Sequence, residues 1–101
     1  MAVYSSGTLN VAAQAAYPST PQVTIPFPPT SIAVVVEEDP ATGYGCVVSF
    51  DGTNDAGTLL AGRPSAALEW RGQSYTKVWI KRAGVSAGTI NVRVMADDGV
   101  I

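Results

Sequence analysis

Short stretches of alternating apolar and polar residues constrain this fold more than any other feature of the sequence. The segment TINVRVMA places Ile90, Val92 and Val94 at every second position. Successive side chains of a β-strand point to opposite faces of the sheet, so this spacing buries one face of the strand. The segments SIAVVVEE and TKVWIKR repeat the pattern. Strands that each bury one face are therefore the predicted building units.

Gly- and Pro-containing turns separate these strands, and no strong helix lies between them. We count six or seven strands without a crossover helix, which predicts an antiparallel sandwich or barrel. A chain of 101 residues fits one domain of this kind. The predicted fold class is all-β: an antiparallel β-sandwich of jelly-roll or immunoglobulin-like type, with an N-terminal arm.

Chain order predicts how neighbouring strands pair. Residues 31–38 and 46–50 flank a long turn and are predicted to form one antiparallel hairpin. Residues 76–82 and 89–96 flank a short Gly-containing loop and are predicted to form another. Residues 51–62, DGTNDAGTLLAG, are predicted to be a turn-rich connection because Gly, Asp and Asn dominate them.

The first 20 residues contain no charged side chain, and a proline-rich stretch follows them. We therefore divide the chain into an N-terminal arm, residues 1–20, and a single β-sandwich domain, residues 21–101. The arm segment forms either a short strand followed by a loop, or an extension that adds a strand to the sheet of a neighbouring subunit. Val23 and Ile25 are predicted to form a short edge strand, which the prolines protect from unwanted pairing.

The charge content restricts the partners of this chain. Charged residues make up 14% of it, against about a quarter in typical domains. Either a Ser/Thr/Ala exterior covers a well-filled core, or other copies and a larger assembly cover some of the faces. A net charge of −2 excludes a basic footprint for nucleic acid. No stretch approaches the roughly 20 apolar residues of a membrane helix, so no membrane partner is predicted.

The chain has no histidine and a single cysteine, Cys46. A Ser-His-Asp triad is therefore impossible. Cys46 lies in the apolar run GCVVSF without a neighbouring base, so we predict a small buried hydrophobe in a protein made in a reducing cytosol. No catalytic residue and no cofactor are predicted, and the chain is not expected to be an enzyme.

Two acidic segments have a functional and a simpler interpretation. The segment DGTND brings Asp51, Asn54 and Asp55 close in sequence, as calcium ligands are. It lacks the remaining ligands of a calcium loop and matches ordinary turn chemistry, so no metal site is predicted. The acidic run Glu37–Asp39 is predicted to be a solvated strand end, because adjacent carboxylates of a strand point to opposite faces.

Aromatic residues beside cations form the remaining candidate site. Trp79, between Lys77 and Lys81, either covers the open side of the sandwich, anchors an interface or forms a platform for a sugar. The candidate interface residues are Val3, Leu9, Val11, Tyr17, Trp70, Tyr75 and Trp79.

The second half of the chain resembles small virion proteins of tailed bacteriophages. The resemblance runs over about residues 46–96, through VVSFDGTNDAGTLLAGRPSAALEW and TKVWIKRAGVSAGTINVRVMA. Its pattern is a strand ending in Ser49-Phe50-Asp51-Gly52, a loop to Gly62, an aromatic strand end at Trp70 and a final V-R-V strand. The Ala/Thr/Gly-rich, charge-poor composition is similar as well.

The resemblance implies a structural role in a phage particle, most like that of a capsid decoration (cement) protein. Such proteins are about one β-domain long, lack a catalytic site and often carry an N-terminal arm. They bind the head surface as oligomers, here a homo-oligomeric trimer or dimer, and bridge major capsid subunits. The expected location is the virion, after synthesis in the host bacterial cytoplasm. The alternative is a receptor-binding, lectin-like module at a tail or fibre tip.

Overall fold

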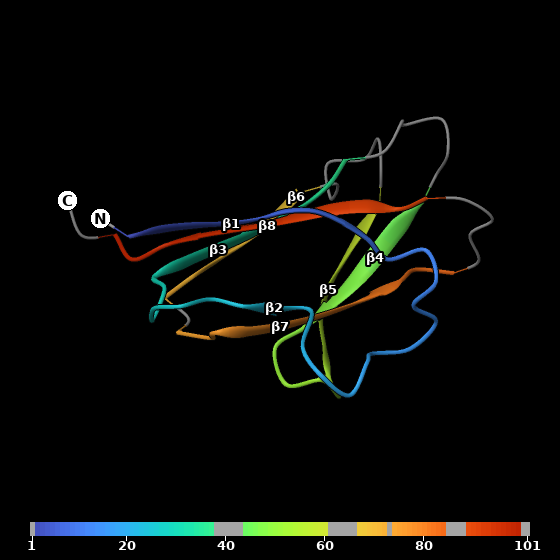
Figure 1. Ribbon diagram of the computed structural model, residues 1–101, viewed down its shortest axis with the longest axis horizontal. Helices are drawn as coiled ribbons and strands as arrows, with labels where there is room; N and C mark the ends of the chain where they lie inside the picture. The colour runs from blue at the N-terminus through green and yellow to red at the C-terminus, as the bar shows by residue number, and fades with distance from the viewer. Residues whose placement is uncertain (1, 38–43, 61–66, 73, 85–88, 100–101) are drawn as a thin grey trace.

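Eight strands make up the regular structure of the residues that the computed structural model describes, which are 2–37, 44–60, 67–72, 74–84 and 89–99 (Figure 1). No helix occurs among them. The strands are β1 (Val3–Asn10), β2 (Val23–Thr24), β3 (Ser31–Val36), β4 (Gly45–Ser49), β5 (Asp55–Leu60), β6 (Ala67–Arg71), β7 (Lys77–Arg82) and β8 (Asn91–Asp97).

The strands pair in nested order, the first with the last. β1 pairs with β8, β2 with β7, β3 with β6 and β4 with β5, all antiparallel. Two further pairs, β3 with β8 and β4 with β7, join these into sheets of order β1-β8-β3-β6 and β2-β7-β4-β5. Eight antiparallel strands in two sheets with this nested pairing form a jelly roll. The predicted β-sandwich is therefore confirmed, and its topology is the jelly-roll one.

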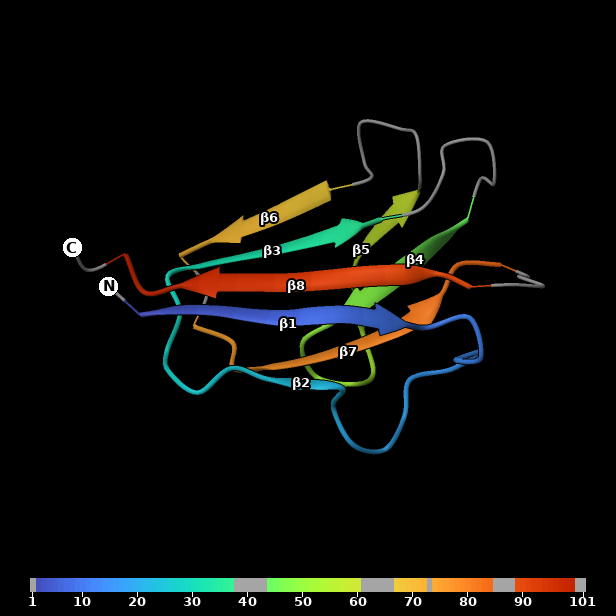
Figure 2. The ribbon, with the colours of Figure 1, turned by 45° about the horizontal axis from the view of Figure 1, so that its top comes forward.

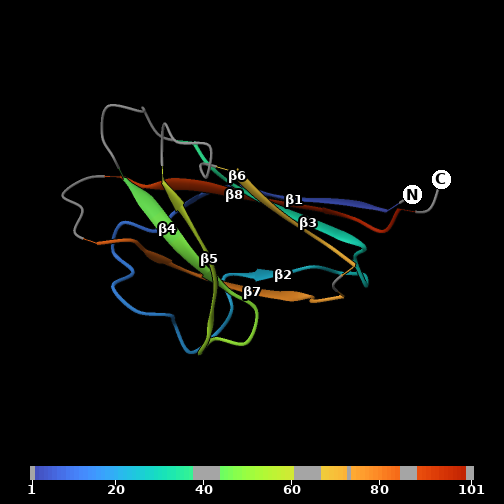
Figure 3. The same cartoon turned by 180° about the vertical axis from the view of Figure 1, so that it is seen from behind.

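The two sheets pack face to face around a single apolar layer (Figures 1 and 3). The predicted alternation is confirmed in β3 and β8, where every second residue is buried. β4 differs, because all five of its residues are buried. The fully buried residues with the largest side chains include Ile32, Leu59, Ile80, Ile90, Val34, Val48, Val78, Val92 and Val94.

Both predicted hairpins are wrong. β3 lies in the first sheet and β4 in the second, and β7 and β8 are likewise in different sheets. In each case the chain crosses from one sheet to the other instead of turning back along the same sheet. The alternation of side chains defines the buried face of a strand, but it does not define the partner of that strand. Chain proximity therefore predicted the wrong neighbours.

The predicted turn-rich connection at 51–62 is also wrong in part. The turn ends at Asn54, and Asp55–Leu60 form β5, the edge strand paired with β4. Leu59 is fully buried in the core. Only one side chain of β5 is fully buried, so the strand lacks the regular alternation by which the others are recognised.

The N-terminal arm is not shown as a separate unit. Residues 3–10 form β1, an edge strand of the first sheet, and the backbone N–H of Val11 donates to the Ile90 carbonyl at 2.9 Å. A register shift interrupts the strand between Ser5 and Thr8. There Gly7 adopts a φ of 70°, and the Ser6 hydroxyl accepts a hydrogen bond from Val94 N–H at 3.0 Å. The first strand is thus part of the domain that was predicted to begin at residue 21.

The segment after β1 wraps around the edge of the second sheet. The Gln14 carbonyl accepts a hydrogen bond from Arg82 N–H at 2.8 Å. The Gln22 side chain accepts from Ile80 N–H at 2.9 Å and donates to the Ile80 carbonyl, as a paired strand would. The predicted short edge strand is confirmed as β2, which begins at Val23 and pairs with the first part of β7. This segment covers most of the exposed edge of β7.

The burial of Leu59 gives the first prediction. Leu59→Ala removes a fully buried side chain and is expected to lower the free energy of unfolding by about 2–5 kcal/mol. Thr58→Ala, at an exposed position of the same strand, is the matched control and is expected to cost less than about 1 kcal/mol. Urea denaturation followed by circular dichroism measures both. Equal effects would contradict the placement of Leu59 in the core.

Candidate functional site

The fold leaves the outer face of the first sheet uncovered by any described segment (Figure 2). In Figure 2 the four strands of this sheet face the viewer, and no segment within the described residues lies in front of them. Their outward side chains form three rows across the sheet. The rows are Val3–Asp97–Ser31–Arg71, Ser5–Met95–Ala33–Glu69 and Thr8–Arg93–Val35–Ala67.

A groove of about 720 Å³ lies along this face. The groove exists because the side chains of Ser31 and Ala33 are too small to fill the space above the central strand β3. Apolar Ala33 and Met95 line it, together with Val3, which is 71% exposed. Polar residues also line the groove: Thr30, Ser31, Glu69, Arg71 and Asp97. Apolar residues surrounded by polar ones are the usual anatomy of an association surface.

The charged groups of this face are held in place by local bonds. Glu69 accepts a hydrogen bond from the Ser31 hydroxyl at 3.2 Å and forms an ion pair with Arg71. Arg93 forms an ion pair with Glu37 at 3.1 Å. Such exposed ion pairs contribute little to stability. Arg71 has a side chain 82% exposed and remains available to an approaching surface.

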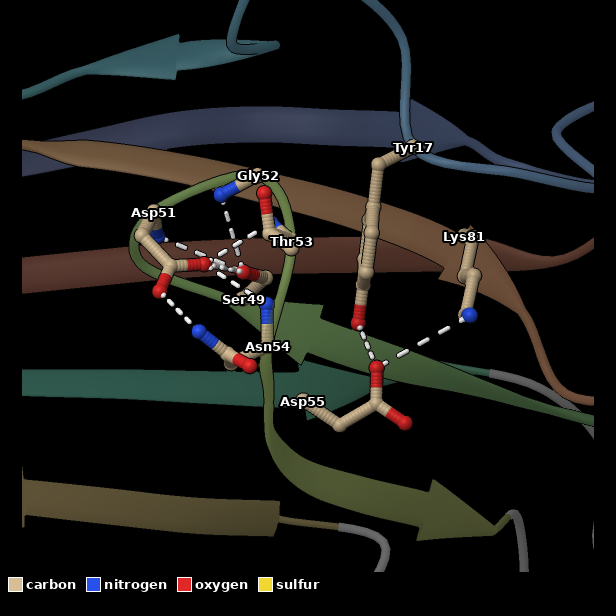
Figure 4. Close-up of polar contacts among 8 residues, drawn as sticks. All are labelled: Tyr17, Ser49, Asp51, Gly52, Thr53, Asn54, Asp55 and Lys81. Atoms are coloured by element: carbon tan, nitrogen blue, oxygen red, sulfur yellow. Dashed lines mark hydrogen bonds and ion pairs between the residues drawn. The ribbon is translucent and has the colours of Figure 1, made fainter.

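The segment between β1 and β2 contacts the second sheet through Tyr17. The Tyr17 hydroxyl donates to Asp55 at 2.6 Å, and Lys81 Nζ lies 4.6 Å from the centroid of the Tyr17 ring (Figure 4). Lys81 also lies 3.8 Å from the same Asp55 oxygen. Burial, and then the hydrogen bond to Asp55, raise the pKa of Tyr17 above its ordinary value. The hydroxyl therefore stays protonated and donates.

The turn that precedes β5 is built around the Asp51 carboxylate (Figure 4). The backbone N–H groups of Thr53 and Asn54 donate to it at 2.8 and 2.7 Å, and the side chain of Asn54 donates at 2.8 Å. The Ser49 hydroxyl donates at 3.0 Å. These bonds, first those from Asn54, hold the pKa of Asp51 well below its ordinary value. The residues interpreted above as turn chemistry thus do form a turn.

Gly52 completes this turn at a φ of 81°, where an L side chain would be strained. A Cβ at this position would lie 3.1 Å from the Trp79 ring. Trp79 is half-buried on the outward side of β7. The Trp79 ring therefore lies against the turn at Gly52.

The other aromatic residues gather at Phe50. The Trp70 ring meets it edge-on with centroids 5.1 Å apart, and the Tyr75 ring stacks on it at 4.6 Å. Tyr75 is 43% exposed. A small depression of about 200 Å³ lies beside Tyr75 and Phe50, and its other lining residues are Asp51, Asn54, Asp55 and Ala56.

The candidate interface residues therefore have different surroundings. Val3 and Tyr75 are exposed, whereas Val11 lies in the core at 2% exposure and Leu9 packs against the core. Leu9 of β1 and Val11, which follows the strand, thus point into the interior. Tyr17 is engaged with its own chain at Asp55.

Sequence reasoning missed the residues that line the groove. Ala33 and Met95, with Arg71 and Asp97, were not among the candidates. The available signal was the outward half of the same alternation: Ala33, Met95 and Asp97 each adjoin a buried strand residue, and Arg71 adjoins the partly buried Trp70. The acidic run is described only at Glu37; its other two members lie outside the described residues.

Cys46 is fully buried, and burial raises the pKa of its thiol to about 12. No group of three or more metal-ligating side chains occurs within the part of the chain that the structure describes. In that same part, no helix is long and apolar enough to cross a membrane.

Comparison with known proteins identifies no relative: no protein-family model and no curated protein sequence matches the chain significantly.

The Asp51 turn gives a pH-dependent prediction. A carboxylate whose pKa is lowered by folding contributes stability at pH values above the pKa of the unfolded state, which is about 3.9. This contribution is lost as the pH falls from that value toward the pKa of the folded state. Asp51→Asn is therefore expected to be less stable than the wild type at pH 7. The difference should shrink at pH 3. Urea denaturation at both pH values measures it, and a difference that does not depend on pH would contradict the role of the carboxylate.

Burial of Cys46 gives a second chemical prediction. The folded protein is expected to leave its thiol unreacted with Ellman's reagent at pH 8, because the thiol is both inaccessible and protonated. Addition of denaturant should release one thiol per chain. Rapid reaction of the folded protein would show that Cys46 is not in the core.

Proposed function

We propose that this chain is a non-catalytic structural protein of a tailed-bacteriophage virion, a decoration protein that binds the head surface as a homo-oligomer. The observation that carries the proposal is the uncovered outer face of the first sheet, with its groove and its exposed Val3. A surface of this kind suits association with other protein surfaces.

The fold supports the same proposal by analogy. Double-sheet jelly rolls recur in viral capsid proteins and in lectins, although a fold alone does not define a function. The polar side chains that lie close enough to react with one another instead form hydrogen bonds that hold the fold together. Ser49 and Asp51 bond one another within a turn, and Tyr17 and Asp55 fasten a wrapping segment. These contacts support a module that acts through its surfaces.

Binding to phage shells tests the proposal. The probe is an empty, expanded shell assembled from the major capsid protein of the phage that, under this proposal, encodes the chain. We expect the protein to sediment with the shells and to saturate at a fixed number of copies per capsid subunit. Protein that stays in the supernatant at every concentration would overturn the proposal. Unfolded protein is excluded by circular dichroism of the same sample.

The depression beside Tyr75 favours a second candidate, a glycan-binding module at a tail or fibre tip. An exposed aromatic ring next to amide and carboxylate oxygens offers the apolar face and the polar groups that a sugar requires.

A glycan array separates this candidate from the first one. If the second candidate holds, the wild type binds a defined glycan, Tyr75→Ala loses that binding and Tyr75→Phe retains it because the stacked ring remains. Absence of binding by the wild type, or binding unchanged in Tyr75→Ala, would reject the glycan site.

A further inference from the structure

We propose that two copies of this chain pair through the outer faces of their first sheets, around a two-fold axis that runs along β3. This inference rests on the proposed function in one respect, namely that the protein self-associates. It adds the surface and the geometry of that association.

The row that contains Ser31 carries opposite charges on the two sides of β3. Asp97 on β8 and Arg71 on β6 flank Ser31 on β3, one on each side, and both line the groove. Neighbouring strands are about 4.8 Å apart, so β8 and β6, which carry the two charged residues, lie at equal distances from β3. Rotation by 180° about an axis above β3 and parallel to it exchanges the two sides. It places Arg71 of each copy over Asp97 of the other.

The next two rows are compatible with this rotation. In the row Met95–Ala33–Glu69, the carboxylate of one copy faces the methionine of the other. In the row Arg93–Val35–Ala67, the guanidinium faces an alanine. No two like charges of the rows meet. A two-fold axis in the same plane but perpendicular to the strands brings like charges together. Over the Ser31 row it places Arg71 and Asp97 each over its own copy, and over the Ala33 row it places Glu69 over its own copy.

Side-chain size along the axis permits the approach. β3 presents Ser31, Ala33 and Val35 outward, and each of them would meet its own copy at the centre of an isologous contact. Packed sheets lie about 10 Å apart, a distance that small side chains at the centre and long ones at the sides can fill. The shared area is only three strands wide, so we expect a weak dimer that depends on concentration.

Charge exchange is the direct test, with sedimentation-equilibrium ultracentrifugation as the readout. Arg71→Glu and Asp97→Arg are each expected to raise the dimer dissociation constant by about tenfold or more, because like charges then face each other. The double variant Arg71→Glu/Asp97→Arg should recover the dimer. Lys77→Glu, which makes the same charge change on β7 of the second sheet, is the matched control and should leave the dimer unchanged.

A cross-link gives a second measurement that tolerates loss of stability in the charge variants. Ala33→Cys places a thiol beside the axis. Sheets about 10 Å apart are too far apart for a direct disulfide, so a short bismaleimide reagent should join the two thiols into a cross-linked dimer on a denaturing gel. Thr58→Cys, at an exposed position of β5, should not give such a dimer. The native thiol of Cys46 is buried and does not interfere.

The outcomes separate this inference from the proposed function. A wild-type oligomer that both charge variants leave intact, with no cross-link at position 33, overturns the pairing through the first sheet while self-association stands. A wild type that is monomeric at every concentration overturns the pairing and the homo-oligomer together. Shell binding is measured independently, so a monomer that sediments with shells would still support the decoration role.

Discussion

The antiparallel pairing of β1 with β8 is the contact on which the rest of the architecture depends. It joins the two ends of the chain: Ala2 N–H donates to the Asp98 carboxylate across 96 positions of sequence. Once β8 holds β1 on one side, it takes β3 on the other, and the remaining strands follow in nested pairs. Closing so long a loop is entropically costly, and the shared apolar layer between the sheets offsets that cost.

The sequence predicts the strands better than it predicts their partners. β3 and β8 were identified with the correct buried faces, because Ile32 and Val92 belong to regular alternations. β5 was missed, since Leu59 is its single fully buried residue. The sheet order was not accessible, because any strand with one apolar face can pair with several others and only the packing of the whole layer selects among them.

The same reasoning explains which site residues were accessible. Tyr75 and Val3, which are exposed, were among the candidates because aromatic and apolar residue types are themselves typical of interfaces. Ala33 was not found, because its small side chain only leaves space above a central strand. That space can be recognised only when the neighbouring strands are known. The two outer faces differ for a related reason. The segment between β1 and β2 is fastened to the second sheet by Tyr17, whereas no described segment covers the first sheet (Figure 2).

The central claim is that the protein acts through the outer face of its first sheet. A dilution series followed by amide chemical shifts in NMR spectra tests it most directly, because the protein needs no substitution. The account predicts shifts that depend on concentration at Ser31, Ala33 and Met95, and constant shifts around Tyr75. Constant shifts across the first sheet, or changes confined to the second sheet, would contradict the account.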